Sequence, residues 1–144
     1  MEKWDKQLFF EDVAEGSETH EISIPVTLQR LVMEAGANMD LSIIHHDNAA
    51  GIATGAPGAY ANSFFIMGMM ERLLREWTGL QGTLKKIGSL RMKVFNSVGD
   101  TITFKGEVRE KHEENASVLL DIWGETDNGQ TVSAEASVIL PKKS

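Results

Sequence analysis

Cysteine is absent from this chain of 144 residues, so it has no disulfide framework, no thiolate nucleophile and no cysteine metal cage. Long hydrophobic runs are missing too. The longest apolar stretch, residues 64–70, is far too short to span a bilayer. The N-terminal segment shows no basic head followed by an apolar run, so no signal peptide is expected. These absences predict a cytoplasmic protein without a membrane partner.

Positive charge is in deficit overall, and the net charge of −7 argues against nucleic acid as a general partner. The basic side chains nevertheless form a local island over residues 79–111, which holds Lys85, Lys86, Arg91, Lys93, Lys105, Arg109 and Lys111. Solvated strand edges explain such an island. The alternative is a binding site for the anionic part of a substrate, such as the phosphates of a carrier.

Residues 62–78 predict one helix of about four turns. Residues 64–70 are apolar on every side, so this half of the helix is expected to be covered all round. The second half is amphipathic, because Met70, Leu73, Leu74 and Trp77 share one face. Gly79 is a plausible stop.

Alternating apolar residues predict strands around this helix. One strand lies within residues 20–26, and Thr27 is expected to cap a second helix that starts at Leu28 and fades near residue 36. After Gly82, four more alternating segments follow, with a hairpin turn signal at residues 127–129. They are centred on residues 90–94, 102–108, 118–122 and 132–140.

Four strands in series predict an antiparallel meander with one buried face. The chain is therefore expected to be a single α+β domain over residues 1–144, in which the sheet wraps around the long helix in the hot-dog architecture. Such a sheet exposes an edge, which predicts at least a dimer with one continuous sheet across it.

The loop over residues 39–61 holds the place where acids and imidazoles crowd together. Asp40 and His45 can hold a water and exchange protons with a substrate, although a cap and a surface residue are the structural alternative. Asp47 is expected to cap a short helical turn that ends at Ala53. No metal site is expected, because His45 and His46 are adjacent and no third ligand stands at helical spacing.

The start of the long helix, at Asn62 and Ser63, offers free backbone N–H groups that favour negative charge. A thioester oxygen that gains charge in an enolate-like transition state could be held there. A plain N-cap by either side chain is compatible with this role, because the cap uses a side chain and the oxyanion site uses backbone donors.

Over nearly its whole length the chain resembles the MaoC-like dehydratase family, which includes (R)-specific enoyl-CoA hydratases. The similar segments are Phe10-Glu-Asp-Val13 with Gly16, Gly36-Ala-Asn-Met-Asp40 with His45-His46-Asp47, Pro57-Gly58, and Leu90-Arg-Met-Lys-Val-Phe95 with Gly99-Asp100. The resemblance implies that Asp40 and His45 form a catalytic dyad. It also implies that the backbone N–H of Ser63 makes the oxyanion contact and that no cofactor is needed beyond the coenzyme A of the substrate.

Two places depart from the family pattern. Ser42-Ile43 stand where the family usually has Asn-Pro, and Asn62-Ser63 stand where it has His-Gly. The chain is similar here to the small subunits of two-chain hydratases that act on steroid side-chain enoyl-CoA thioesters. In those proteins the dyad lies on the small chain, and the partner is a second MaoC-like chain.

The leading hypothesis is an enoyl-CoA hydratase of lipid metabolism that adds water to a fatty-acyl or steroid side-chain trans-2-enoyl-CoA and gives a 3-hydroxyacyl-CoA. The candidate substrate-binding residues are Gly58, Tyr60 and Asn62, with Lys85, Lys86, Arg91 and Lys93 for the coenzyme A phosphates. The expected partner is a second copy or a second MaoC-like chain.

Two alternatives remain. A hot-dog thioesterase or acyl-carrier dehydratase commonly has an acid on the central helix, and residues 64–70 contain none. The other alternative is a pocket-forming subunit that is not active alone.

Overall fold

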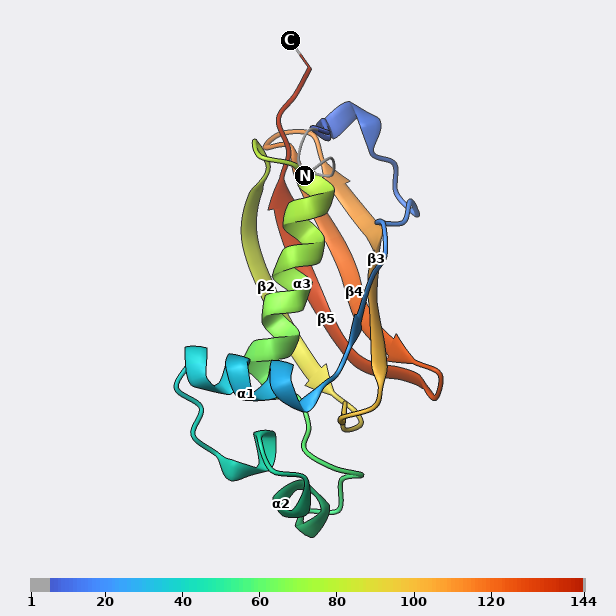
Figure 1. Ribbon diagram of the computed structural model, residues 1–144. Coiled ribbons are helices and arrows are strands. Elements are labelled where there is room, and N and C mark those ends of the chain that lie inside the picture. The colour runs from blue at the N-terminus through green and yellow to red at the C-terminus, as the bar shows by residue number, and fades with distance from the viewer. Residues whose placement is uncertain (1–5, 144) are drawn as a thin grey trace.

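The computed structural model describes residues 6–143, in which five antiparallel strands form one sheet and the longest helix lies along one face of it (Figure 1). The elements are η2 (Phe10–Asp12), β1 (Ile22–Pro25), α1 (Leu28–Ala37), η3 (Ile43–His45), α2 (Asn48–Ala53), α3 (Ser63–Thr78), β2 (Thr83–Met92), β3 (Thr101–His112), β4 (Ser117–Thr126) and β5 (Gly129–Ile139). Within these residues no helix is both long and apolar enough to cross a membrane.

The sheet has the strand order β1-β3-β4-β5-β2, so the predicted four-strand meander is wrong at one position. Strands β3, β4 and β5 do follow one another, but β2 pairs with β5 and not with β3. The reason lies in the connection after β2, which is not a tight turn. In this connection the carbonyl of Asn96 accepts the N–H of Ala61 at 2.9 Å. The connection therefore passes the start of α3 and crosses to β3, which β4 and β5 separate from β2.

Alternation along β3, β4 and β5 buries one side of each strand, as predicted. The buried side chains include Ile102 and Phe104 on β3, Leu120 and Ile122 on β4, and Val138 on β5. For β2 the predicted centre was wrong: the strand ends at Met92, and Val94 lies beyond it and is exposed.

Helix α3 packs its sheet-facing side into the core. Phe65, Ile66, Met70, Leu73 and Leu74 are buried, and Gly79 ends the helix with a φ of 77°, a backbone conformation that suits glycine. The expectation that residues 64–70 are covered all round is wrong for the chain by itself. Phe64 is 61% exposed and Met67 is 38% exposed, because the helix turns them away from the sheet.

Two capping residues set where helices α1 and α2 begin. Thr27 accepts the N–H of Arg30 at 3.2 Å at the start of α1, and Asp47 accepts the N–H of Ala50 at 2.8 Å at the start of α2. Both caps were predicted. Helices α1 and α2 lie at the end of the molecule where α3 begins (Figure 1). The loop with Asp40 and His45 therefore meets the N-terminus of α3.

Candidate active site

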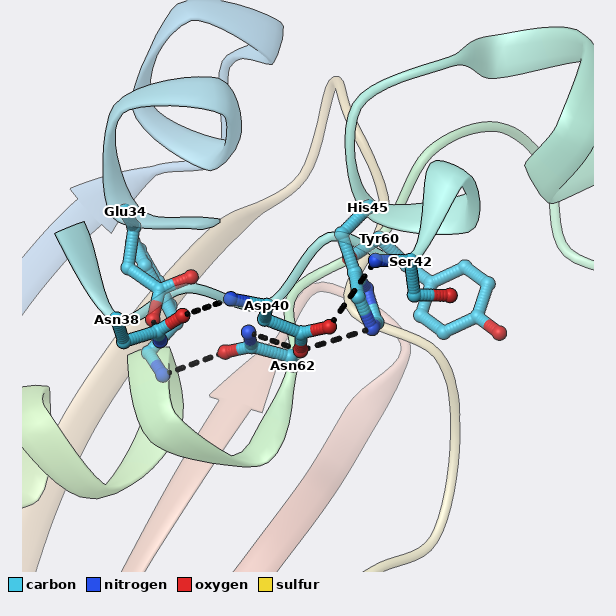
Figure 2. Close-up of polar contacts among 8 residues, drawn as sticks. Glu34, Asn38, Asp40, Ser42, His45, Tyr60 and Asn62 are labelled. Carbon is cyan, nitrogen blue, oxygen red and sulfur yellow. Dashed lines mark hydrogen bonds and ion pairs between the residues drawn. The ribbon is translucent and has the colours of Figure 1, made fainter. Parts of the chain in front are cut away.

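Asp40 and His45 approach one another at the start of α3, with 3.5 Å between Asp40 Oδ2 and His45 Nε2 (Figure 2). His45 ends η3 and is only 8% exposed, whereas the Asp40 side chain is partly open to solvent. Met39, just before Asp40, has a φ of 62°, a left-handed conformation that turns the chain sharply after α1. The two side chains that the sequence singled out are thus brought together.

The backbone around His45 sets its tautomer. Nδ1 lies 2.7 Å from the carbonyl oxygen of Tyr60, which can only accept a hydrogen bond. The Nδ1 atom therefore carries a proton, and in the neutral ring the lone pair of Nε2 faces Asp40. Two acceptors, Nε2 and the Asp40 carboxylate, then point at the same small region.

Asn62 joins the helix start to this pair. Its Oδ1 accepts the N–H of Phe65 at 2.8 Å as the N-cap of α3, and its Nδ2 donates to Asp40 Oδ2 at 2.7 Å. This hydrogen bond is the main cause that lowers the pKa of Asp40, with help from the N–H of Ser42 and the nearby imidazole of His45, while burial acts in the opposite direction. The carboxylate of Asp40 is thereby held in its charged form.

Ser63 is the first residue of α3 and is exposed. The first N–H groups of a helix have no intrahelical partner. Those of Phe65 and Ile66 are satisfied by Asn62. The N–H groups of Ser63 and Phe64 remain as the donors that helical geometry leaves free at this end.

A second carboxyl group, which the sequence analysis missed, lies on the other side of Asp40. Glu34 of α1 accepts a hydrogen bond from Nδ2 of Asn38, and Oδ1 of Asn38 accepts the N–H of Asp40 at 3.0 Å (Figure 2). Burial and the charge of Asp40 raise the pKa of Glu34. The spacing of four residues from Glu34 to Asn38 on a helix was the signal that could have found it. Within residues 6–143, no group of three or more His, Asp or Glu side chains is arranged to hold a metal ion.

An open apolar groove of about 360 Å³ runs between α1 and α3 beside this cluster. Its lining residues are Ile24, Arg30, Met33, Glu34, Phe64, Phe65, Gly68 and Met69. Gly68 leaves space here, since a Cβ added to it would meet no atom within 4 Å outside its own neighbourhood. The groove thus starts at the first turn of α3 and follows the outer side of the helix.

Tyr60 and Gly58 occupy different surroundings. The ring of Tyr60 packs edge-on against His45, with 5.2 Å between centroids, and contacts Phe95 at 4.6 Å. Gly58 is packed against α2, because a Cβ on Gly51 would approach its carbonyl oxygen to 2.1 Å. Tyr60 therefore lies beside the dyad, whereas the position of Gly58 is explained by packing.

Three of the four basic candidates lie on β2, and Lys93 follows it directly. Lys85 and Lys86 lie close to the end of α3, because residues 79–82 join that end directly to β2. Arg91 and Lys93 lie near the other end of β2, where they line a hollow with Asp121 on the outer face of the sheet. Of the four, only Arg91 and Lys93 lie near the end of the sheet where α3 begins.

Known proteins resemble this chain in sequence and in structure. No family model matches the chain. It is 30% identical over 110 residues to the beta subunit of a 3-oxo-4,17-pregnadiene-20-carboxyl-CoA hydratase from Mycobacterium tuberculosis, a match that covers 76% of this chain and 83% of the relative.

Solved structures agree on the fold. The crystal structure of the ChsH1–ChsH2 complex from M. tuberculosis matches with a TM-score of 0.82 and 26% identity, over 88% of this chain and 98% of that chain. An (R)-hydratase from A. caviae matches with a TM-score of 0.83 and 22% identity, over 91% and 99% of the two chains. The (R)-hydratase PhaJ1 from Pseudomonas aeruginosa has a TM-score of 0.86 at 19% identity, over 95% and 88%.

A five-stranded antiparallel sheet around a central helix, with these structural matches, defines a hot-dog protein. Within that class, the chain belongs to the MaoC-like (R)-hydratase family.

Proposed function

We propose that this chain carries the active site of an enoyl-CoA hydratase, with Asp40 and His45 as the groups that activate water. The observation that carries the proposal is the convergence of two acceptors: Asp40 Oδ2 and His45 Nε2 lie 3.5 Å apart, and Nδ1 of His45 faces a carbonyl oxygen. A water that donates one hydrogen to each acceptor satisfies both.

In this mechanism the water oxygen bonds to Cβ of the trans-2-enoyl thioester as one of its protons passes to the dyad. The C=C electron pair shifts toward the thioester carbonyl, and a proton is then delivered to Cα. The product is the 3-hydroxyacyl thioester, so one molecule of water is consumed and no electrons are gained or lost.

The start of α3 would meet the charge that develops on the thioester oxygen. The N–H groups of Ser63 and Phe64 have no intrahelical partner, and the helix dipole adds positive potential. Since Asn62 contacts Asp40 at 2.7 Å, these donors stand beside the dyad. Donors fixed before the reaction stabilise an oxyanion without reorganisation.

The acyl tail would lie in the groove between α1 and α3, which starts at the same turn of the helix. Phe64, Phe65, Met33 and Met69 give it apolar walls, and Gly68 leaves it open. A groove of about 360 Å³ suits a bulky apolar group. The similarity to a hydratase of a pregnadiene-carboxyl-CoA favours a steroid side-chain thioester over a short fatty acyl group.

Arg91 and Lys93 are the better placed of the basic candidates for the coenzyme A phosphates, because they lie near the end of β2 that is close to the start of α3. They line the outer face of the sheet, so the phosphates would reach them around the end of β2. Lys85 and Lys86 lie at the opposite end of the strand. They would need to act on the substrate of a neighbouring subunit.

A second chain is also part of the proposal. Met67 is 38% exposed on the helix surface, and β2 is a long strand at the edge of the sheet. One similar protein is a beta subunit, and another is solved as a two-chain complex. We therefore propose a heteromer with a second MaoC-like chain, with a homodimer as the alternative.

The test compares the purified chain alone with the chain co-purified with its native partner. Loss of the conjugated enoyl thioester measures hydration, and release of free coenzyme A measures thioester hydrolysis. Hydration that disappears in His45→Ala supports the proposal. Hydration only in the co-purified sample identifies a subunit that needs its partner. Coenzyme A release without hydration, or full activity of His45→Ala, overturns the assignment.

A further inference from the structure

The proposed hydration leaves Glu34 without a role, although its carboxyl group lies inside the hydrogen-bonded cluster that holds Asp40 (Figure 2). Glu34 also lines the apolar groove between α1 and α3. A carboxyl group beside apolar walls is costly to keep charged unless it is paired or hydrogen-bonded. The partner of Glu34 is Asn38, which connects it to the site.

Glu34 is linked to the backbone of Asp40 through one residue. The side chain of Asn38 donates to Glu34 and accepts the N–H of Asp40 at 3.0 Å, so its amide links the carboxyl group of Glu34 to the backbone of Asp40. Between them, Met39 has a φ of 62°, a conformation that costs energy for a side chain of this size. A strained turn keeps its shape only when its surroundings hold it.

Charged and polar groups of three segments lie around Glu34. Asp40 and His45 face it from the loop after α1 and act oppositely on its pKa: Asp40 raises it and His45 lowers it. Asn62 at the start of α3 is uncharged and lowers the pKa by hydrogen bonding. Arg30, one turn earlier on α1, lines the same groove. Glu34 therefore keeps its proton to a higher pH than Asp40 does.

We propose that Glu34 is a positioning residue of this site: through Asn38 it holds the turn that presents Asp40 to His45. This inference rests on the proposed hydratase function for its catalytic consequence. Because the pKa of Asp40 is lowered and that of Glu34 is raised, Asp40 loses its proton while Glu34 is still neutral. Glu34 therefore acts on Asp40 through hydrogen bonds, and its charge does not set the basicity of Asp40.

The test compares Glu34→Ala, which removes the acceptor, with Glu34→Gln, which keeps an oxygen that can accept from Asn38. Glu107→Ala, at an exposed acid of β3, is the matched control. Kinetics are measured on the complex that is active in hydration. Glu34→Ala releases the turn, so kcat should fall about tenfold with little change in KM. Glu34→Gln and Glu107→Ala should stay within about twofold of wild type.

A second readout needs no substrate. The carboxyl carbon of Asp40, followed by NMR, should titrate with a pKa closer to its usual range in Glu34→Ala, because a displaced Asp40 loses the hydrogen bond from Asn62. The titration should be unchanged in Glu34→Gln and in Glu107→Ala. Asp40 titrations and kcat values that coincide in Glu34→Ala and wild type overturn the inference. A shifted Asp40 titration in a protein that does not hydrate enoyl thioesters supports the positioning role and refutes the hydratase function instead.

Discussion

Two groups of charged side chains, one on the outer face of the sheet and one at the start of α3, are built on opposite principles. On the sheet, Arg109 of β3 pairs with Asp121 at 3.0 Å and with Glu135 at 3.1 Å, and all three are exposed. At the start of α3, neither Asp40 nor Glu34 pairs with a Lys or Arg among residues 6–143, and the amide of Asn38 links the carboxyl group of Glu34 to the backbone N–H of Asp40.

The pKa shifts show what this difference means. On the sheet, Glu135 raises the pKa of Arg109 and Arg109 lowers the pKa of Glu135, so each partner stabilises the charged form of the other. In the site the pKa values of the two acids move apart: the pKa of Asp40 is lowered, chiefly by the hydrogen bond from Asn62, and the pKa of Glu34 is raised, chiefly by burial. Acids with divergent pKa values are typical of proton-transfer sites. We conclude that the first group is structural and the second is suited to chemistry.

The strongest test of the difference between the two groups neutralises one acid in each. Asp40→Asn should lower kcat about 100-fold or more, because the amide cannot accept a proton from water. Asp121→Asn removes the same charge from the sheet and should leave kcat unchanged. Steady-state hydration rates, with circular dichroism to check the fold, measure both. Equal effects of the two substitutions would remove the distinction.

A proline at position 63 tests the backbone donor. Ser63 is the first residue of α3, where proline fits the helix and only removes the N–H. Ser63→Pro should therefore cost about 100-fold in kcat, whereas Ser63→Ala keeps the donor and should be nearly neutral. A large loss in Ser63→Ala would assign the role to the hydroxyl group.

Filling the groove should separate substrates by size. Gly68→Leu places a large side chain on the outer side of α3, where the backbone has room for it, and replacing glycine inside a helix does not weaken the helix. The kcat/KM for a bulky enoyl-CoA should fall about tenfold, and that for a four-carbon enoyl-CoA should barely change. Equal losses for both substrates would place the acyl tail elsewhere.

The smallest expected effect concerns stability. Because the pKa of Glu34 is raised in the folded chain, its contribution to stability is present below the unfolded pKa and is lost as pH rises through the folded value. Glu34→Gln should thus match wild type at acidic pH and melt about one to three degrees higher near neutrality. Melting curves at several pH values check this, and the opposite sign would mean that the charge is stabilising.

Local signals were enough to predict much of this protein from its sequence. Thr27 and Asp47 were expected as caps and are caps, because side chains of their type satisfy the first N–H groups of a helix. The alternation on β3, β4 and β5 fixed which residues face α3. The proximity of Asp40 and His45 followed from their spacing and from the family resemblance, and the structure brings them to 3.5 Å. Their catalytic roles stay predictions.

What the sequence did not predict depends on contacts between distant segments. The pairing of β2 with β5 follows from the path of residues 93–100 past Ala61, which no local pattern encodes. Exposure of Phe64 depends on what else covers the helix, so an apolar stretch alone could not reveal it. Glu34 was not singled out from the sequence, and its position beside Asp40 arises only when the loop after α1 folds back toward the helix.

The two hydrogen bonds of the Asn62 side chain connect the backbone N–H of Phe65 to the site. The side-chain amide of Asn62 binds both this N–H and Asp40, so opening the first turn of α3 also releases Asp40. Local opening exposes such protons to exchange with solvent at a rate set by its free energy. Deuterium uptake at the backbone N–H of Phe65 would thus measure how often the site opens in the resting protein, without any added substrate.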